Sequence, residues 1–180
     1  MPSRRRTPRG RQPNRGRPET LARKLTGRQL AIPFVTVGEL TQWTYLRRWE
    51  RLTGKDPLRL IALVSEAVLL QQIGGPAVLR DQLLHLATVL EEHPDTIQLR
   101  VIPFTAPGSG VFGASTFHLI DFTGPRLPVL AWLETVSDNR ILDEDTQVRE
   151  LSFTHADALA QSLSTKDSLQ LAEGYARKLV

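Results

Sequence analysis

Apolar positions along the chain repeat with the two periods that distinguish strands from helices. Residues 58–64, LRLIALV, form an apolar run apart from Arg59, which is typical of a strand buried on both faces. Residues 97–101 alternate between apolar and polar side chains, as in a half-buried strand. Leucines recur at helical spacing between residues 79 and 90 behind a Gly-Gly-Pro turn. The middle of the chain is therefore predicted to be strand, helix, strand.

Three further strands are predicted on either side of this unit. The apolar run 30–35 contains Pro33, which favours an edge position or a strand start because proline cannot donate to the ladder. Residues 117–122 and 128–133, joined by a Gly-Pro turn, are typical of an antiparallel pair. We predict that the acidic stretch 137–145 is a loop.

Helical spacing returns at the end of the chain, at residues 148–159 and 169–179, with a cap beginning at Ser164. Together these elements predict an α/β (or α+β) fold. It has a mixed sheet of about four to five strands, packed helices and two C-terminal helices.

Positive charge is concentrated at the N-terminus. Residues 1–28 carry ten Arg or Lys and one Glu, a net charge of +9; residues 29–180 carry thirteen and eighteen, a net charge of −5. Residues 1–18 are rich in Arg, Pro and Gly, so we predict a disordered basic arm. The arm is either a solvated tail or a nucleic-acid contact made through phosphates. The candidate contact residues are Arg4, Arg5, Arg6, Arg9, Arg11, Arg15 and Arg17.

The amino-acid composition excludes several kinds of site and argues against a membrane or secreted location. The chain has no cysteine, which excludes disulfides and cysteine-ligated zinc, and its four histidines show no ligand-motif spacing. No apolar run approaches the roughly 18–20 residues of a membrane span, and no apolar stretch follows the basic N-terminus as in a secretory signal. We expect a cytoplasmic protein with no metal and no cofactor.

Residues 50–180 carry a resemblance. The run RLTGKDPLRLIALVSEAVLLQQIGGPAVLRDQLLHLA, followed by IQLRVIPF, STFHLIDF and VLAWLE, is similar to the C-terminal domain of actinobacterial antitoxin-like regulators of the WhiJ type. The resemblance implies a non-enzymatic module that receives a signal or binds a small partner protein or a ligand, usually behind a helix-turn-helix domain. Here no helix-turn-helix precedes residue 50, and Gln71-Gln72 stands where basic residues are expected. We therefore do not expect this chain alone to bind a specific DNA sequence.

Residues 17–49 resemble an internal piece of a toxin-type PIN-domain ribonuclease. Such nucleases gather several carboxylates around divalent metal, and only Glu39 matches such a position here. Thr36, three residues earlier, also makes Glu39 a good capping-box residue of a helix. The alternative function is thus a degenerate remnant of a metal-dependent ribonuclease toxin. Mg²⁺- or Mn²⁺-dependent RNA cleavage that Glu39→Ala abolishes would instead indicate a working nuclease.

Four residues remain as candidates for contact with a ligand or partner. Glu66 and Glu134 lie at or near the ends of predicted strands, where they either serve a site or begin a helix and end a strand. Trp132 and Phe112 either line an apolar pocket or pack within the fold. The predicted organisation is an arm at 1–18, a PIN-like segment at 19–49 and an antitoxin-like regulator domain at 50–180.

Overall fold

The computed structural model describes residues 29–33, 52–108, 116–122, 128–135 and 139–179, and for 29–33 the backbone alone. The predicted basic arm, the capping box around Glu39 and the candidate Phe112 lie outside the described residues.

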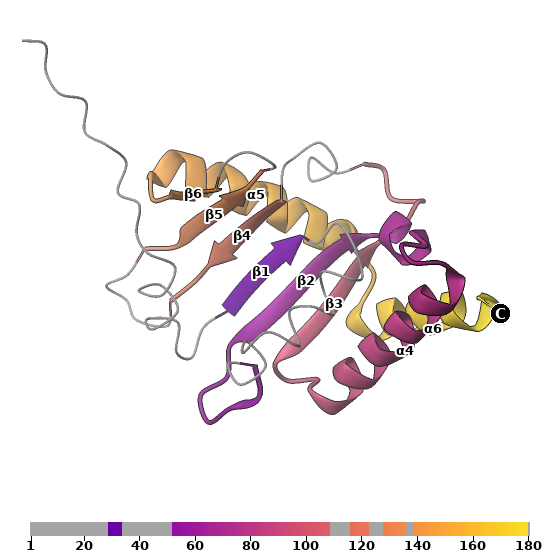
Figure 1. Ribbon diagram of the computed structural model, residues 1–180. Coiled ribbons are helices and arrows are strands. Elements are labelled where there is room, and N and C mark those ends of the chain that lie inside the picture. Colours follow the sequence, from indigo (N-terminus) through magenta and orange to yellow (C-terminus); the bar gives the residue numbers. More distant parts are fainter. Residues whose placement is uncertain (1–28, 34–51, 109–115, 123–127, 136–138, 180) are drawn as a thin grey trace, which may run out of the picture.

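A single mixed sheet forms the centre of the molecule, with strand order β3-β2-β1-β4-β5-β6 (Figure 1). Strands β1, β2 and β3 are parallel to one another, and β4, β5 and β6 follow in antiparallel order. The strands are β1 (Gln29–Pro33), β2 (Arg59–Ser65), β3 (Ile97–Ile102), β4 (Thr116–Ile120), β5 (Leu130–Glu134) and β6 (Asn139–Leu142).

The predicted α/β class is confirmed, and the sheet has one strand more than the five that the pattern indicates. The additional strand is β6, which lies in the stretch predicted to be an acidic loop. It has four residues, of which Asn139 and Arg140 are exposed, so it carries no alternating pattern. Its strand conformation comes from pairing with β5 at the margin of the sheet.

β1 occupies an interior position, although Pro33 favours an edge. The strand pairs in parallel with β2 along its whole length and antiparallel with β4 only at Leu30 and Ala31. Pro33 is its last residue and lies beyond the ladder with β4, so the missing N–H is tolerated there. The edge expectation is therefore wrong, and residues 29–33 share one sheet with the body of the chain.

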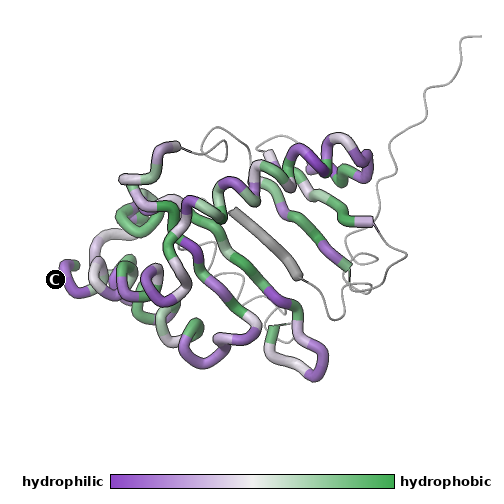
Figure 2. Tube along the Cα trace, turned by 180° about the vertical axis from the view of Figure 1, so that it is seen from behind, coloured by the Kyte–Doolittle hydropathy of each residue, from purple (hydrophilic) through white to green (hydrophobic). Residues whose placement is uncertain are grey.

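Helices cover the two faces of the sheet unequally (Figure 1). Helices α4 (Pro76–Glu92) and α6 (Thr165–Lys178) pack together over β2 and β3. Helix α5 (Asp145–Gln161) runs across the opposite face, as the view from behind shows (Figure 2). The two predicted C-terminal helices are thus present, one on each face.

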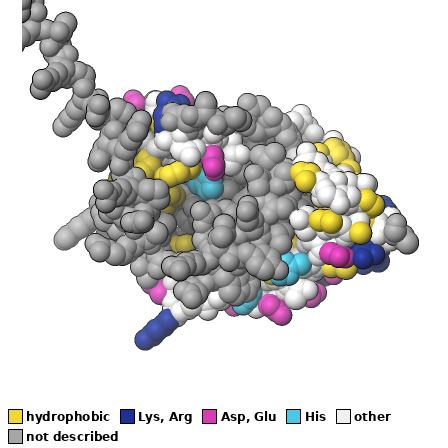
Figure 3. Space-filling model, in the orientation of Figure 1, with side chains coloured by type: hydrophobic (Ala, Val, Ile, Leu, Met, Phe, Trp, Pro, Cys, Tyr) yellow, Lys and Arg dark blue, Asp and Glu magenta, His cyan; other side chains and the backbone are white. Residues whose placement is uncertain are grey.

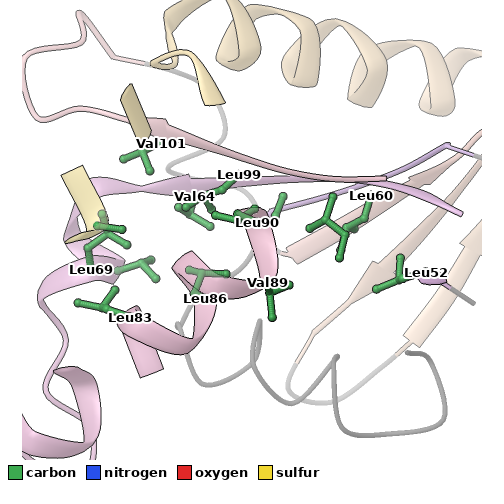
Figure 4. Packing of buried hydrophobic residues seen from close by; sticks show 14 of the residues in the cluster. Leu52, Leu60, Val64, Leu69, Leu83, Leu86, Val89, Leu90, Leu99 and Val101 are labelled. Atoms are coloured by element: carbon green, nitrogen blue, oxygen red, sulfur yellow. The ribbon is translucent and has the colours of Figure 1, made fainter. Parts of the chain in front are cut away.

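The main core lies between α4 and strands β2 and β3 (Figure 4). Alternate residues of the two strands meet the leucine stripe of α4, which is the arrangement that the sequence pattern predicts. Each fully buried leucine contributes about 1.5–3 kcal/mol to stability. The side chains labelled in this core are Leu52, Leu60, Val64, Leu69, Leu83, Leu86, Val89, Leu90, Leu99 and Val101.

The chain crosses from one face to the other past the edge of β3. Leu163 N donates to Val101 O at 2.8 Å, and Val101 N donates to Ser168 Oγ at 3.0 Å. Arg100 donates from Nε to Ser162 Oγ at 3.1 Å and from Nη2 to Leu159 O at 3.4 Å. Leu163, before α6, and Ser168, within α6, therefore satisfy both outer backbone groups of Val101 on this edge strand.

Among the residues that the structure describes, no helix is both long and apolar enough to cross a membrane.

Candidate functional site

The two candidate carboxylates lie at the same end of the sheet, where the parallel strands have their carboxyl ends, but they are not neighbours. Because β5 is antiparallel to β4, and β4 to β1, β5 ends at the same edge as the parallel strands. Glu66 follows β2 and Glu134 ends β5, with β1 and β4 between them. Three strand spacings place these two strand ends about 14 Å apart. Glu66 and Glu134 therefore belong to two separate candidate sites.

Glu66 joins three elements at this edge. It begins the 3₁₀ helix η1 (Glu66–Leu70), whose N-cap Ser65 accepts a hydrogen bond from Ala67 N at 3.3 Å. Glu66 as a whole residue is 9% exposed. Its Oε2 accepts from Phe104 N at 2.7 Å, and its Oε1 accepts from Tyr175 OH at 2.5 Å. Both oxygens are thus satisfied, as a buried carboxylate requires.

Tyr175, in the last turns of α6, is the partner that the sequence analysis did not identify. The hydrogen bond to Glu66 raises the pKa of Tyr175, and burial and the carboxylate's charge raise it further. Lys178 Nζ lies 5.3 Å from the centroid of the Tyr175 ring. Tyr175 follows Glu66 by 109 positions, so no local pattern connects the two residues.

Hydrophobic side chains project from the surface around this buried carboxylate. Four of the six large hydrophobic residues that are exposed in the described part of the chain belong to it. We call them the Glu66 surface: Leu70 (44% exposed), Ile73 (63%), Val78 (43%) and Phe104 (62%). In Figure 3, hydrophobic side chains gather at the end of the molecule where η1 and the start of α4 lie.

A glycine turn shapes this surface between η1 and α4. Gly74 and Gly75 have φ values of +85° and +95°, a region that L side chains rarely adopt. A Cβ on Gly74 would also meet Val78 Cγ1 at 3.2 Å. The two glycines thus let the chain turn sharply, with Ile73 exposed before the turn and Val78 close to Gly74.

The second candidate site contains three residues of β4 and β5. His118 lies opposite Trp132 in the antiparallel register, and His118 Nε2 is 3.8 Å from Glu134 Oε2. His118 is buried, whereas the Glu134 side chain is 55% exposed. In Figure 3 a histidine and an acidic side chain lie side by side over this part of the sheet. Trp132 is partly buried against the main core cluster, so it has a packing role.

The other candidate residues predicted from the sequence lie outside the part of the chain that the structure describes. They are Glu39, Phe112 and the seven arm arginines. Within the described ranges, no three His, Asp or Glu side chains gather as ligands of a metal ion would.

Comparison with protein families identifies the family of the chain. A family model described as "Domain of unknown function (DUF5753)" matches residues 19–173. No curated protein matches the chain. The matched range crosses residue 49, where a boundary is predicted, and it includes β1 in the middle of the sheet. The chain therefore belongs to the DUF5753 family.

Proposed function

We propose that the chain is a non-enzymatic, cytoplasmic binding module of an antitoxin-like transcription regulator, and that it engages a small partner protein. The observation that carries the proposal is the Glu66 surface, whose four exposed hydrophobic residues belong to segments next to Glu66, at the end of the molecule where hydrophobic side chains gather in Figure 3. The resemblance of residues 50–180 to WhiJ-type regulators supports the same class of function. The family match by itself names no activity.

The character of the surface favours a protein partner over a small molecule. Sites for small molecules are concave and bury most of their ligand. Ile73 and Phe104 are instead more than 60% exposed, so they project outward. Large apolar side chains, aromatic ones above all, supply the central anchors of protein interfaces. Phe104 and Ile73 are the residues that we expect to act as anchors.

A capture experiment from extracts of the source organism tests the proposal, with the tagged full-length chain as bait. We expect a small protein to be recovered in stoichiometric amount with the unaltered chain. We expect Ile73→Ser and Phe104→Ser each to reduce its recovery about tenfold or more, the effect of losing an interface anchor.

Phe153→Ser provides the matched control. Phe153 is 69% exposed but lies on α5, on the opposite face of the sheet from α4 and α6. Equal loss of the partner with all three substitutions, or no stoichiometric partner at all, would contradict the proposal.

A second candidate function rests on the charge asymmetry. Residues 1–28 carry a net charge of +9 while the rest of the chain carries −5, and seven of the ten basic residues in this range are the arginines of the arm at 1–18. Nucleic-acid contact is therefore expected at the arm. Such contact would be non-specific in sequence, because phosphate contacts carry no base information. It is compatible with partner binding by the body.

A further inference from the structure

We infer that Glu66 is a positioning residue that couples the C-terminal helix α6 to the Glu66 surface. Docking of α6 then controls how firmly the Phe104 segment is held on the surface that a partner would bind. The inference concerns regulation and rests on the proposed function of that surface. Its basis is a carboxylate whose two oxygens bind two elements that are remote from each other in sequence.

On the surface side, Glu66 fixes the backbone of the most prominent aromatic residue. Phe104 follows β3 by two positions, and its side chain is 62% exposed. Its amide is held by Glu66 Oε2 at 2.7 Å. A hydrogen bond to an ionised acceptor is stronger than a neutral one. The carboxylate therefore restrains the backbone from which the Phe104 side chain projects.

On the helix side, α6 is held at both ends by different contacts. Ser164 caps its first turn by accepting from Asp167 N at 3.1 Å, and buried Ser168 accepts from Val101 N. Near the other end, Ala176 is buried and Tyr175 OH donates to Glu66 Oε1 at 2.5 Å. The bond to Glu66 at the end of the helix is therefore a separate contact from the cap of its first turn.

These contacts make the two sides dependent on each other. When α6 is docked, both oxygens of Glu66 have donors and the carboxylate is held in one orientation. When Tyr175 is lost or displaced, Oε1 of Glu66 has to find water or another donor, which disfavours the present orientation of this largely buried residue. The remaining bond to Phe104 N is then weakened, and the Phe104 segment opens more often. By linkage, a partner that holds Phe104 in place stabilises the docked α6.

Hydrogen exchange of the full chain, followed by mass spectrometry, tests this coupling without a partner. In Tyr175→Phe, we expect exchange to rise about tenfold at the end of α6 and also at Phe104, the factor that the loss of one charge-assisted hydrogen bond produces in local opening. Glu66→Gln keeps the side-chain volume and removes the charge, and we expect it to raise exchange at the same two places.

Ser164→Ala is the matched control, because it weakens the other end of the same helix. We expect faster exchange in the first turn of α6 and no change at Phe104. Unchanged exchange at Phe104 in Tyr175→Phe, or the same increase there in Ser164→Ala, would overturn the inference.

The capture experiment separates this inference from the proposed function. Coupling in the exchange experiment, together with lower recovery of the partner by Tyr175→Phe, supports both. Coupling without any captured partner overturns the proposed function and leaves the link between α6 and Phe104 in place. A partner lost by Ile73→Ser but captured normally by Tyr175→Phe overturns the inference alone.

Discussion

His155 is a partly buried histidine of α5. It lies in α5, seven residues after buried Val148 and three before buried Ala158, which places it on the sheet-facing side of the helix. Its Nε2 is buried and has no hydrogen-bond partner in the described part of the chain. Burial lowers the pKa of His155 below its ordinary value of 6.5, because the charged form is poorly solvated there.

The partial burial of His155 makes the free energy of unfolding depend on pH. Below pH 6.5 the unfolded chain binds a proton at His155, and the folded chain does so only at lower pH. We expect the free energy of unfolding to fall as the pH drops below 6.5, and to fall less steeply in His155→Leu. Urea unfolding at pH 7.5 and pH 5.5 measures the difference, and equal losses in both proteins would contradict the assignment.

At the scale of elements, the β3 edge shows how α6 and the segment before it complete the sheet. The amide of Val101 is bonded to the fully buried hydroxyl of Ser168, and the carbonyl of Val101 is bonded to Leu163 N. An edge strand with unpaired backbone groups invites pairing with other chains. The C-terminal part of the chain therefore protects β3 as well as covering its face.

Ser168→Ala tests the strength of this junction. The substitution leaves the Val101 amide buried without its acceptor, which costs about 1–3 kcal/mol of stability. Urea unfolding measures the loss. Ser152→Ala is the control, because the Ser152 hydroxyl donates only to the carbonyl of Val148 in its own helix, and we expect a change within about 0.5 kcal/mol. Equal effects of the two substitutions would show that α6 does not depend on this bond.

At the scale of the whole molecule, charge divides the chain into a basic N-terminal part and an acidic remainder. We expect the full chain to bind nucleic acid with an affinity that falls steeply with salt, because each neutralised phosphate releases counterions. If all seven arm arginines make such contacts, the slope of log K against log salt reaches about −6 on duplex DNA.

Mobility shifts over a salt series, with the full chain and a chain lacking residues 1–18, measure this contribution. We expect the shortened chain to lose binding. Binding that survives the deletion would place the nucleic-acid surface in the acidic remainder and contradict the prediction.

The sequence by itself determined the elements whose burial is regular. The run at 58–64, the alternation at 97–101 and the leucine stripe of α4 are local patterns, and the structure contains β2, β3 and α4 where they predict them. The α/β class follows from the order of these elements. The two C-terminal helices follow from spacing and from the Ser164 cap in the same way.

Only the tertiary structure decided the position of β1, the pairing of β6 and the role of Glu66. β1 is interior because two other strands meet it there, and β6 is a strand because β5 provides a ladder for it. Glu66 is a strand-end carboxylate in the sequence, and it becomes a bridge when Phe104 and Tyr175, 38 and 109 positions away, reach its two oxygens. The hydrophobic periodicity of a segment indicates which of its side chains are buried. Hydrogen-bond partners that are far apart in the sequence depend instead on how whole helices and strands pack.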